Sequence, residues 1–113
     1  MRPDPAHSDV RENLFGGTGR VLVASLVSHP LAAPFTTVLL CELSPGGRVG
    51  AHAQEHDAEI VIALAGEAVL YVDRDAHAVL PGGVVSLPWK STLEIDNASV
   101  TEPFVYLIVK AKS

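Results

Sequence analysis

The sequence predicts an all-β protein of one domain, folded as a small barrel or jelly roll of antiparallel strands. Three observations support this prediction: short apolar segments recur along the chain, turn residues separate them, and no window shows the periodicity of an amphipathic helix. A length of 113 residues suits a single domain that encloses one core.

Eight segments are expected to be strands because they are rich in the β-branched and aliphatic residues that strands favour. In chain order they cover residues 20–27, 35–43, 59–65, 67–73, 77–80, 84–87, 92–96 and 104–110. Gly, Pro, Asn, Asp and Ser, which favour chain reversals, are frequent between them. Residues 1–10 hold two prolines and few apolar side chains. We therefore predict an N-terminal arm over residues 1–10 and a barrel domain over residues 11–113.

The charge and the cysteine content limit which partners and which cellular location are expected. Eight basic against thirteen acidic residues give a net charge of -5, and no basic run is present, so nucleic acid is not an expected partner. No apolar run approaches the ~18 residues needed to cross a bilayer, so no membrane partner is expected either. The single cysteine, Cys41, rules out an internal disulfide, and the first residues do not resemble a signal peptide. We expect a cytoplasmic protein.

The apolar content exceeds what one small core needs. Hydrophobic residues make up 48% of the chain and the mean hydropathy is +0.29. Residues 104–110 are apolar on both faces of the expected strand, since both alternating sets of side chains are hydrophobic. The barrel interior would cover one face and a second subunit the other, so we predict a homodimer.

Polar residues of a kind that bind metals or ligands gather before the third apolar segment. His52 and Gln54 are two residues apart, so in a strand their side chains point to the same side. Glu59 follows after a polar turn and opens a segment that is apolar on both faces. This carboxylate therefore stands beside buried positions, where it needs a metal, a cation or hydrogen bonds.

The spacing of these residues resembles the first conserved motif of the cupin superfamily. Five residues separate Gly46 from His52, one residue separates His52 from Gln54, four precede Glu59, and six precede Gly66. The family motif reads Gly, His, His, Glu, Gly, so the chain departs from it only at Gln54.

A second cupin motif also fits the chain, with Gly82, Pro88 and Asn97 at the family's spacing. The family has Gly and His at the positions that Lys90 and Leu93 occupy here. Together the two motifs cover residues 46–97, and the chain is identified as a small single-domain cupin with a degenerate metal-binding motif.

The resemblance implies a double-stranded β-helix with a metal site in the barrel mouth. Carried over residue by residue, the family's four ligands fall on His52, Gln54, Glu59 and Leu93. Gln54 offers a neutral and weaker donor than imidazole, and Leu93 offers none. Strand alternation independently turns Leu93 inward, since the charged residues of 92–97 all lie on the opposite face.

Three functions follow. We favour a barrel that binds a small organic ligand and holds no cofactor. Its anchors would be His52, Gln54 and Glu59, its walls Leu93, Ile95 and Val61, and its cap Trp89 beside Lys90.

The first alternative is a metal-dependent cupin enzyme of dioxygenase or isomerase type, with a divalent metal ion on His52, Gln54 and Glu59. The second is a metal-free isomerase or epimerase in which His52 or Glu59 transfers a proton. His56 is interpreted as a solvated turn residue rather than a replacement ligand.

Overall fold

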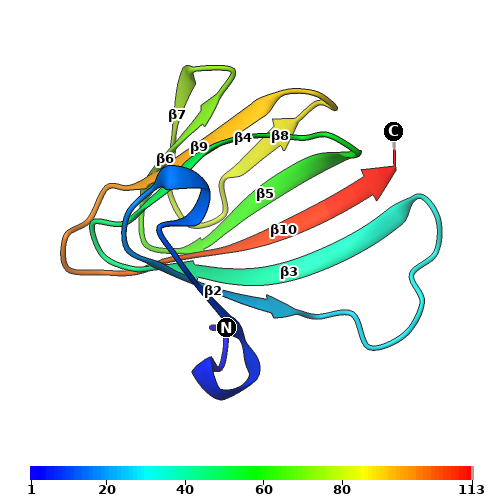
Figure 1. The fold of residues 1–113 in the computed structure, drawn as a ribbon, viewed down its shortest axis with the longest axis horizontal. Coiled ribbons are helices and arrows are strands. Elements are labelled where there is room, and N and C mark those ends of the chain that lie inside the picture. Colours follow the sequence, from blue (N-terminus) through cyan, green and yellow to red (C-terminus); the bar gives the residue numbers. More distant parts are fainter. Residues whose placement is uncertain (113) are drawn as a thin grey trace.

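Two antiparallel sheets build the computed structural model, which describes residues 1–112 (Figure 1). Among the described residues, the larger sheet has six strands in the order β1-β2-β3-β10-β5-β8, and the smaller has four in the order β4-β9-β6-β7. The strands are β1 Asp9–Glu12, β2 Arg20–Ser25, β3 Phe35–Leu43, β4 Arg48–Ala53, β5 Asp57–Ala65, β6 Ala68–Val72, β7 Asp75–Val79, β8 Val84–Leu87, β9 Thr92–Asn97 and β10 Phe104–Lys112. Two short 3-10 helices, η1 Pro5–His7 and η2 Leu14–Gly16, precede β2. The predicted all-β barrel is confirmed.

All eight predicted segments form strands, and β3 and β8 have the predicted bounds. The structure adds β4, which carries His52 of the first motif and ends one residue before Gln54, and β1, which pairs antiparallel with β2. Because β1 begins at Asp9, the last residues of the proposed arm belong to the sheet. The division into an arm over 1–10 and a domain over 11–113 stays a prediction, and residue 113 lies outside the described residues.

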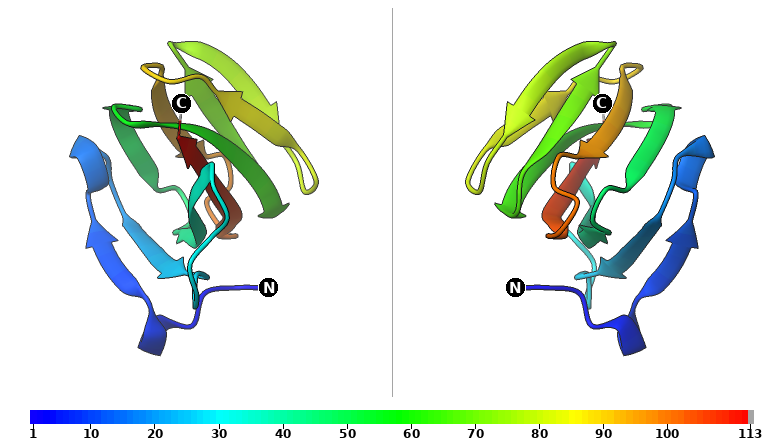
Figure 2. Two further views of the ribbon diagram at one scale, coloured as in Figure 1. Left: turned by 90° about the vertical axis from the view of Figure 1, so that its right-hand side faces the viewer. Right: turned by 90° about the vertical axis from the view of Figure 1, so that its left-hand side faces the viewer.

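Strand β10 lies between β3 and β5, where its two apolar faces have different neighbours (Figure 2). Phe104 and Tyr106 point into the core and are almost fully buried. Leu107, on the other face, pairs with Leu40 of β3 and Ile62 of β5 and is only half-buried. On this second face Leu107 and Val109 are half-buried, whereas Val105 is fully buried. The predicted homodimer, which would cover this face, stays a prediction.

Two motif residues shape the barrel rather than its cavity. Gly66 has a φ of +79°, and a Cβ at this position would lie 2.3 Å from a backbone oxygen, so only glycine fits without a shift. Asn97 is buried, and its Nδ2 donates hydrogen bonds to the backbone oxygens of Ser44 and Glu102 at 3.1 and 2.9 Å. The amide thereby ties the end of β9 to two neighbouring loops and satisfies buried backbone groups.

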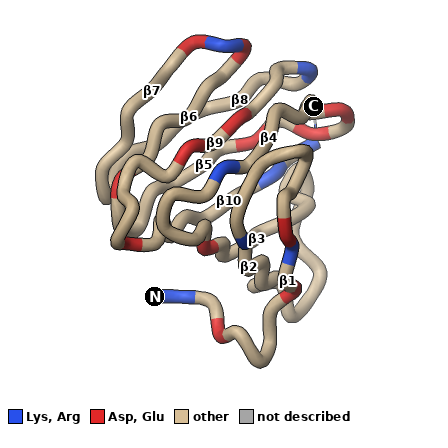
Figure 3. Tube along the Cα trace, turned by 60° about the vertical axis from the view of Figure 1, so that its left-hand side comes forward, with Lys and Arg blue, Asp and Glu red and all other residues tan. Residues whose placement is uncertain are grey.

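Charged residues are dispersed over the molecule. Figure 3 shows Lys and Arg interspersed with Asp and Glu along the described chain, with no continuous basic stretch. Within residues 1–112, no helix has the length and apolar character needed to span a bilayer.

Candidate functional site

Strands β4 and β9 place His52 directly beside Leu93. The two residues are paired in the antiparallel register, so their side chains lie on the same face of the smaller sheet. The register shifts between Val49 and His52, which marks a bulge where β4 bends. Leu93 is only 1% exposed and belongs to the core. The inward orientation predicted for Leu93 from strand alternation is confirmed.

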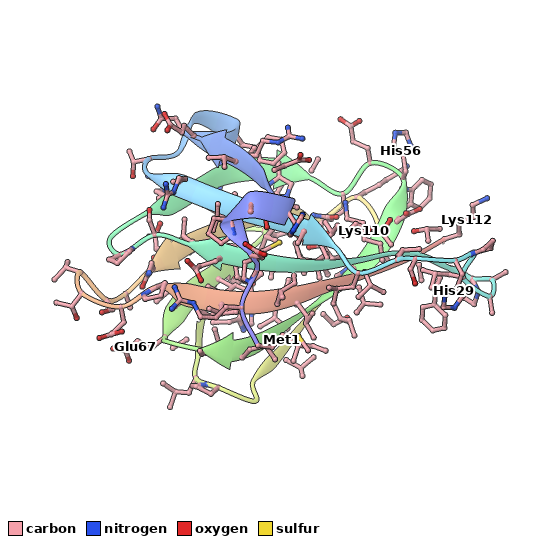
Figure 4. The ribbon with its side chains drawn as sticks, turned by 90° about the horizontal axis from the view of Figure 1, so that it is seen from below. Met1, His29, His56, Glu67, Lys110 and Lys112 are labelled. Carbon is pink, nitrogen blue, oxygen red and sulfur yellow. The ribbon has the colours of Figure 1, made fainter. Side chains whose placement is uncertain are left out.

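Strand β5 of the larger sheet brings Glu59 to the same interior. Glu59 is 3% exposed, and its register partner on β10 is Lys110. Lys110 Nζ lies 3.9 Å from Glu59 Oε1, a distance that suits an ion pair but exceeds a hydrogen bond. Figure 4 shows Lys110 at the same end of the barrel as the turn that carries His56, with Glu67 at the opposite end.

An inner cavity of about 320 Å³ joins these groups. His52, Glu59 and Leu93 all line it, as does the predicted wall residue Ile95. Most of its walls are Leu, Val, Ile and Phe side chains, and its polar lining consists of Arg11, Cys41, His52, Glu59, Tyr106 and Lys110. The mouth predicted from the two motifs is thus a mostly apolar space with a few convergent polar groups.

An outer cavity of about 550 Å³ adjoins the inner one and shares Phe15, His52 and Lys110 with it. Gln54 lines the outer cavity and is absent from the described lining of the inner cavity. It is 5% exposed, and its Nε2 has no hydrogen-bond partner in the described structure. His52 thus touches both cavities, while Gln54 and Glu59 each face a different one.

Helix η2 covers the mouth with an aromatic ring. Phe15 stacks on the imidazole of His52, with ring centroids 4.1 Å apart and an interplanar angle of 15°. This close approach requires Gly50, because a Cβ there would lie 1.9 Å from the backbone oxygen of Phe15. Phe15 itself has a φ of +54°, in the left-handed region that a bulky residue rarely adopts.

Burial alters the protonation of the polar groups. Desolvation raises the pKa of Glu59 to about 7, although the Lys110 ammonium acts in the opposite direction. Glu59 Oε2 has no hydrogen-bond partner in residues 1–112. Desolvation lowers the pKa of His52, so its imidazole is neutral at pH 7. His52 Nδ1 lies 3.3 Å from the backbone oxygen of Gly50, and a proton on Nδ1 would leave Nε2 as an acceptor.

The residues present do not fit the metal that the family resemblance implies. Leu93 has no donor atom, and Gln54 offers only a neutral amide and lines a different cavity from Glu59. Within the described chain, no group of three or more His, Cys, Asp and Glu is arranged to hold a metal ion. A transition metal needs several strong donors in a single shell, and the four family positions supply only two here, His52 and Glu59.

The other predicted site residues have different positions. Val61 is buried in the core but is not in the described lining of either cavity. Trp89 is 47% exposed, lies outside both described linings, and donates from Nε1 to the backbone oxygen of Glu55 at 2.8 Å. Its role in ligand binding stays a prediction. His56 is exposed and lines the outer cavity.

Sequence reasoning missed Phe15, Arg11 and Lys110. Lys110 had a detectable signal, since it follows Phe104, Tyr106 and Ile108 at two-residue spacing and so shares the inward face of that strand. Phe15 and Arg11 had none, because their place depends on how residues 9–17 pack on β2 and β4.

Comparisons with known proteins agree with this architecture. No family model matches the chain, and no curated protein does. Among solved structures, a Cupin 2 conserved barrel domain protein from Salinispora arenicola is 30% identical over 100% of this chain and 88% of its own, with a TM-score of 0.76. A predicted oxalate decarboxylase from Thermotoga maritima is 24% identical over 100% of both chains, with a TM-score of 0.84.

A cupin-2 domain protein from Rhodospirillum rubrum is 21% identical over 100% of this chain and 74% of its own, with a TM-score of 0.76. The relationship to the Salinispora protein spans the full described barrel and both motifs. The chain therefore belongs to the cupin superfamily.

Proposed function

We propose that this cupin barrel binds a small organic ligand in its inner cavity. The observation that carries the proposal is Glu59, a buried carboxyl group with one oxygen that has no hydrogen-bond partner in the described structure. An unsatisfied buried polar group costs about 1–3 kcal/mol. A ligand that hydrogen-bonds to Glu59 would remove this penalty.

The surroundings of Glu59 suit a ligand with an apolar body. Leu93 and Ile95 form an apolar wall from β9, and His52 and Lys110 place polar groups near the mouth. A cavity of about 320 Å³ lies at the lower end of the range usual for small-molecule sites.

Proton transfer by Glu59 is the second candidate function. Burial brings the pKa of Glu59 to about 7, where a carboxyl group exchanges protons readily at physiological pH. The neutral imidazole of His52 lines the same cavity and would serve as the second group of an isomerase or epimerase. If the parent protein turns over a bound ligand, and Glu59→Gln still binds that ligand but no longer converts it, the result would favour proton transfer by Glu59 over binding alone.

Filling the inner cavity tests the binding proposal. Val23 lines this cavity from β2, and Val23→Phe would extend a ring into it. Val100 is exposed and lies outside both described linings, so Val100→Phe is the matched control. Fragments detected by NMR should shift resonances of inner-cavity residues in the parent and in Val100→Phe, but not in Val23→Phe. Binding that survives in Val23→Phe would contradict the proposal.

A further inference from the structure

The charges that line the inner cavity are unbalanced. Arg11 from β1 and Lys110 from β10 contribute two cationic side chains, whereas Glu59 is the sole acidic residue in its described lining. Arg11 Nη2 lies 3.6 Å from Asp9, but both side chains are more than half exposed, so this pair neutralises little of the positive charge. Solvent also screens the exposed Arg11 side chain, so Lys110 is the cation that acts most strongly inside the cavity.

Lys110 holds the central position among these charges. Its side chain lines both cavities and is 35% exposed, so the ammonium lies where the outer cavity leads into the inner one. At 3.9 Å from Glu59 Oε1, Lys110 Nζ is too far away to donate a hydrogen bond to that carboxyl group. An ammonium has three N–H donors, so it can bind a second oxygen ligand at this point.

We propose that the inner cavity takes a small organic carboxylate with an apolar body, and that Lys110 binds the carboxylate where the outer cavity meets the inner one. This inference rests on the proposed function and narrows it to one class of ligand. The apolar walls formed by Leu93, Ile95 and Ile108 would take the body of the ligand. A charge-assisted N–H···O contact in so apolar a setting is stronger than one between neutral groups.

The outer cavity sets the direction in which such a ligand lies. Glu55 and Asp57 line it, and Asp57 Oδ2 accepts a hydrogen bond from Thr36 at 2.7 Å. These carboxylates repel an anion, so the charged end of the ligand would not remain in the outer cavity. The charged end would lie instead at Lys110, the one described cationic residue that both cavities share.

Titration calorimetry with matched probes tests the inference. The probes are benzoate, phenylacetate and hexanoate, each paired with the corresponding neutral amide. We expect the carboxylates to bind at least about tenfold more tightly than the amides, the difference that one charge-assisted hydrogen bond supplies. Lys110→Met should abolish this preference, and Lys110→Arg should retain it. Lys112→Met is the control, since Lys112 belongs to the same strand but lies outside both described linings.

The outcomes separate the inference from the proposed function. Amides that bind as tightly as carboxylates, or equal effects of Lys110→Met and Lys112→Met, would overturn the role of Lys110 and leave ligand binding intact. The absence of binding by every probe would overturn both. Unfolding curves for each variant establish that it is folded, and the retained preference in Lys110→Arg keeps the test valid if Lys110→Met is destabilised.

Discussion

Glu59→Gln should change how the stability of the barrel depends on pH. The carboxyl group is buried beside an apolar cavity, and one of its oxygens has no partner in the described structure. Its charged form is therefore disfavoured in the folded state, where the pKa rises from 4.5 to about 7. Glutamine has nearly the same shape and no charge to bury, so the variant removes this pH dependence while keeping the packing.

The magnitude follows from the two pKa values of Glu59. The folded state binds the proton more tightly than the unfolded state, so the contribution to stability is fully present below about pH 4.5. It is lost as the pH rises toward about 7. The difference between 4.5 and about 7 corresponds to about 3 kcal/mol. Relative to Glu59→Gln, the parent should lose about this much free energy of unfolding between pH 4.5 and pH 8.

Urea unfolding at pH 4.5, 6, 7 and 8 measures this difference, with both proteins compared at each pH. The control is Glu55→Gln, which removes an exposed carboxylate four residues away. It should follow the parent at every pH. A parent that gains stability relative to Glu59→Gln as the pH rises would refute the reasoning, because it would mean that Glu59 is stabilised as an anion.

Three further outcomes are expected. Leu93→His should raise the affinity for divalent transition metals by on the order of tenfold or more, measured by calorimetry, because it adds an imidazole donor beside His52 in the cavity that Glu59 also lines. An unchanged affinity would contradict the alignment of the second motif. Lys90 has a φ of +73° where the family has Gly, so Lys90→Gly should stabilise the fold by about 0.5 kcal/mol in thermal unfolding. Lys90→Met, which keeps the strained backbone and loses the cation–π contact with Trp89, should not stabilise it. The proposed homodimer should sediment as a dimer and dissociate in Leu107→Lys, and a monomeric parent protein would exclude it.

The strands were predictable because their signal is local. Segments such as 35–43 and 84–87 are apolar and end at turn residues, so both their identity and their limits can be read from neighbouring residues. The inward direction of Leu93 was predictable for the same reason. Side chains alternate between the two faces of a strand, and the face with the charged residues meets solvent, so the other face points to the core. Strand β1 was missed because three of the four residues of Asp9–Glu12 are charged and all four are exposed, and only its pairing with β2 makes it a strand.

The sequence by itself determined the architecture and the loss of a metal donor at position 93, because both depend on side-chain type and on alternation along single strands. The tertiary structure decided which groups meet. Gln54 and Glu59, close in sequence, face different cavities, while Lys110 reaches Glu59 from a strand about fifty residues away in the sequence. Such pairings depend on the register between strands and on the bulge in β4, which no local pattern encodes.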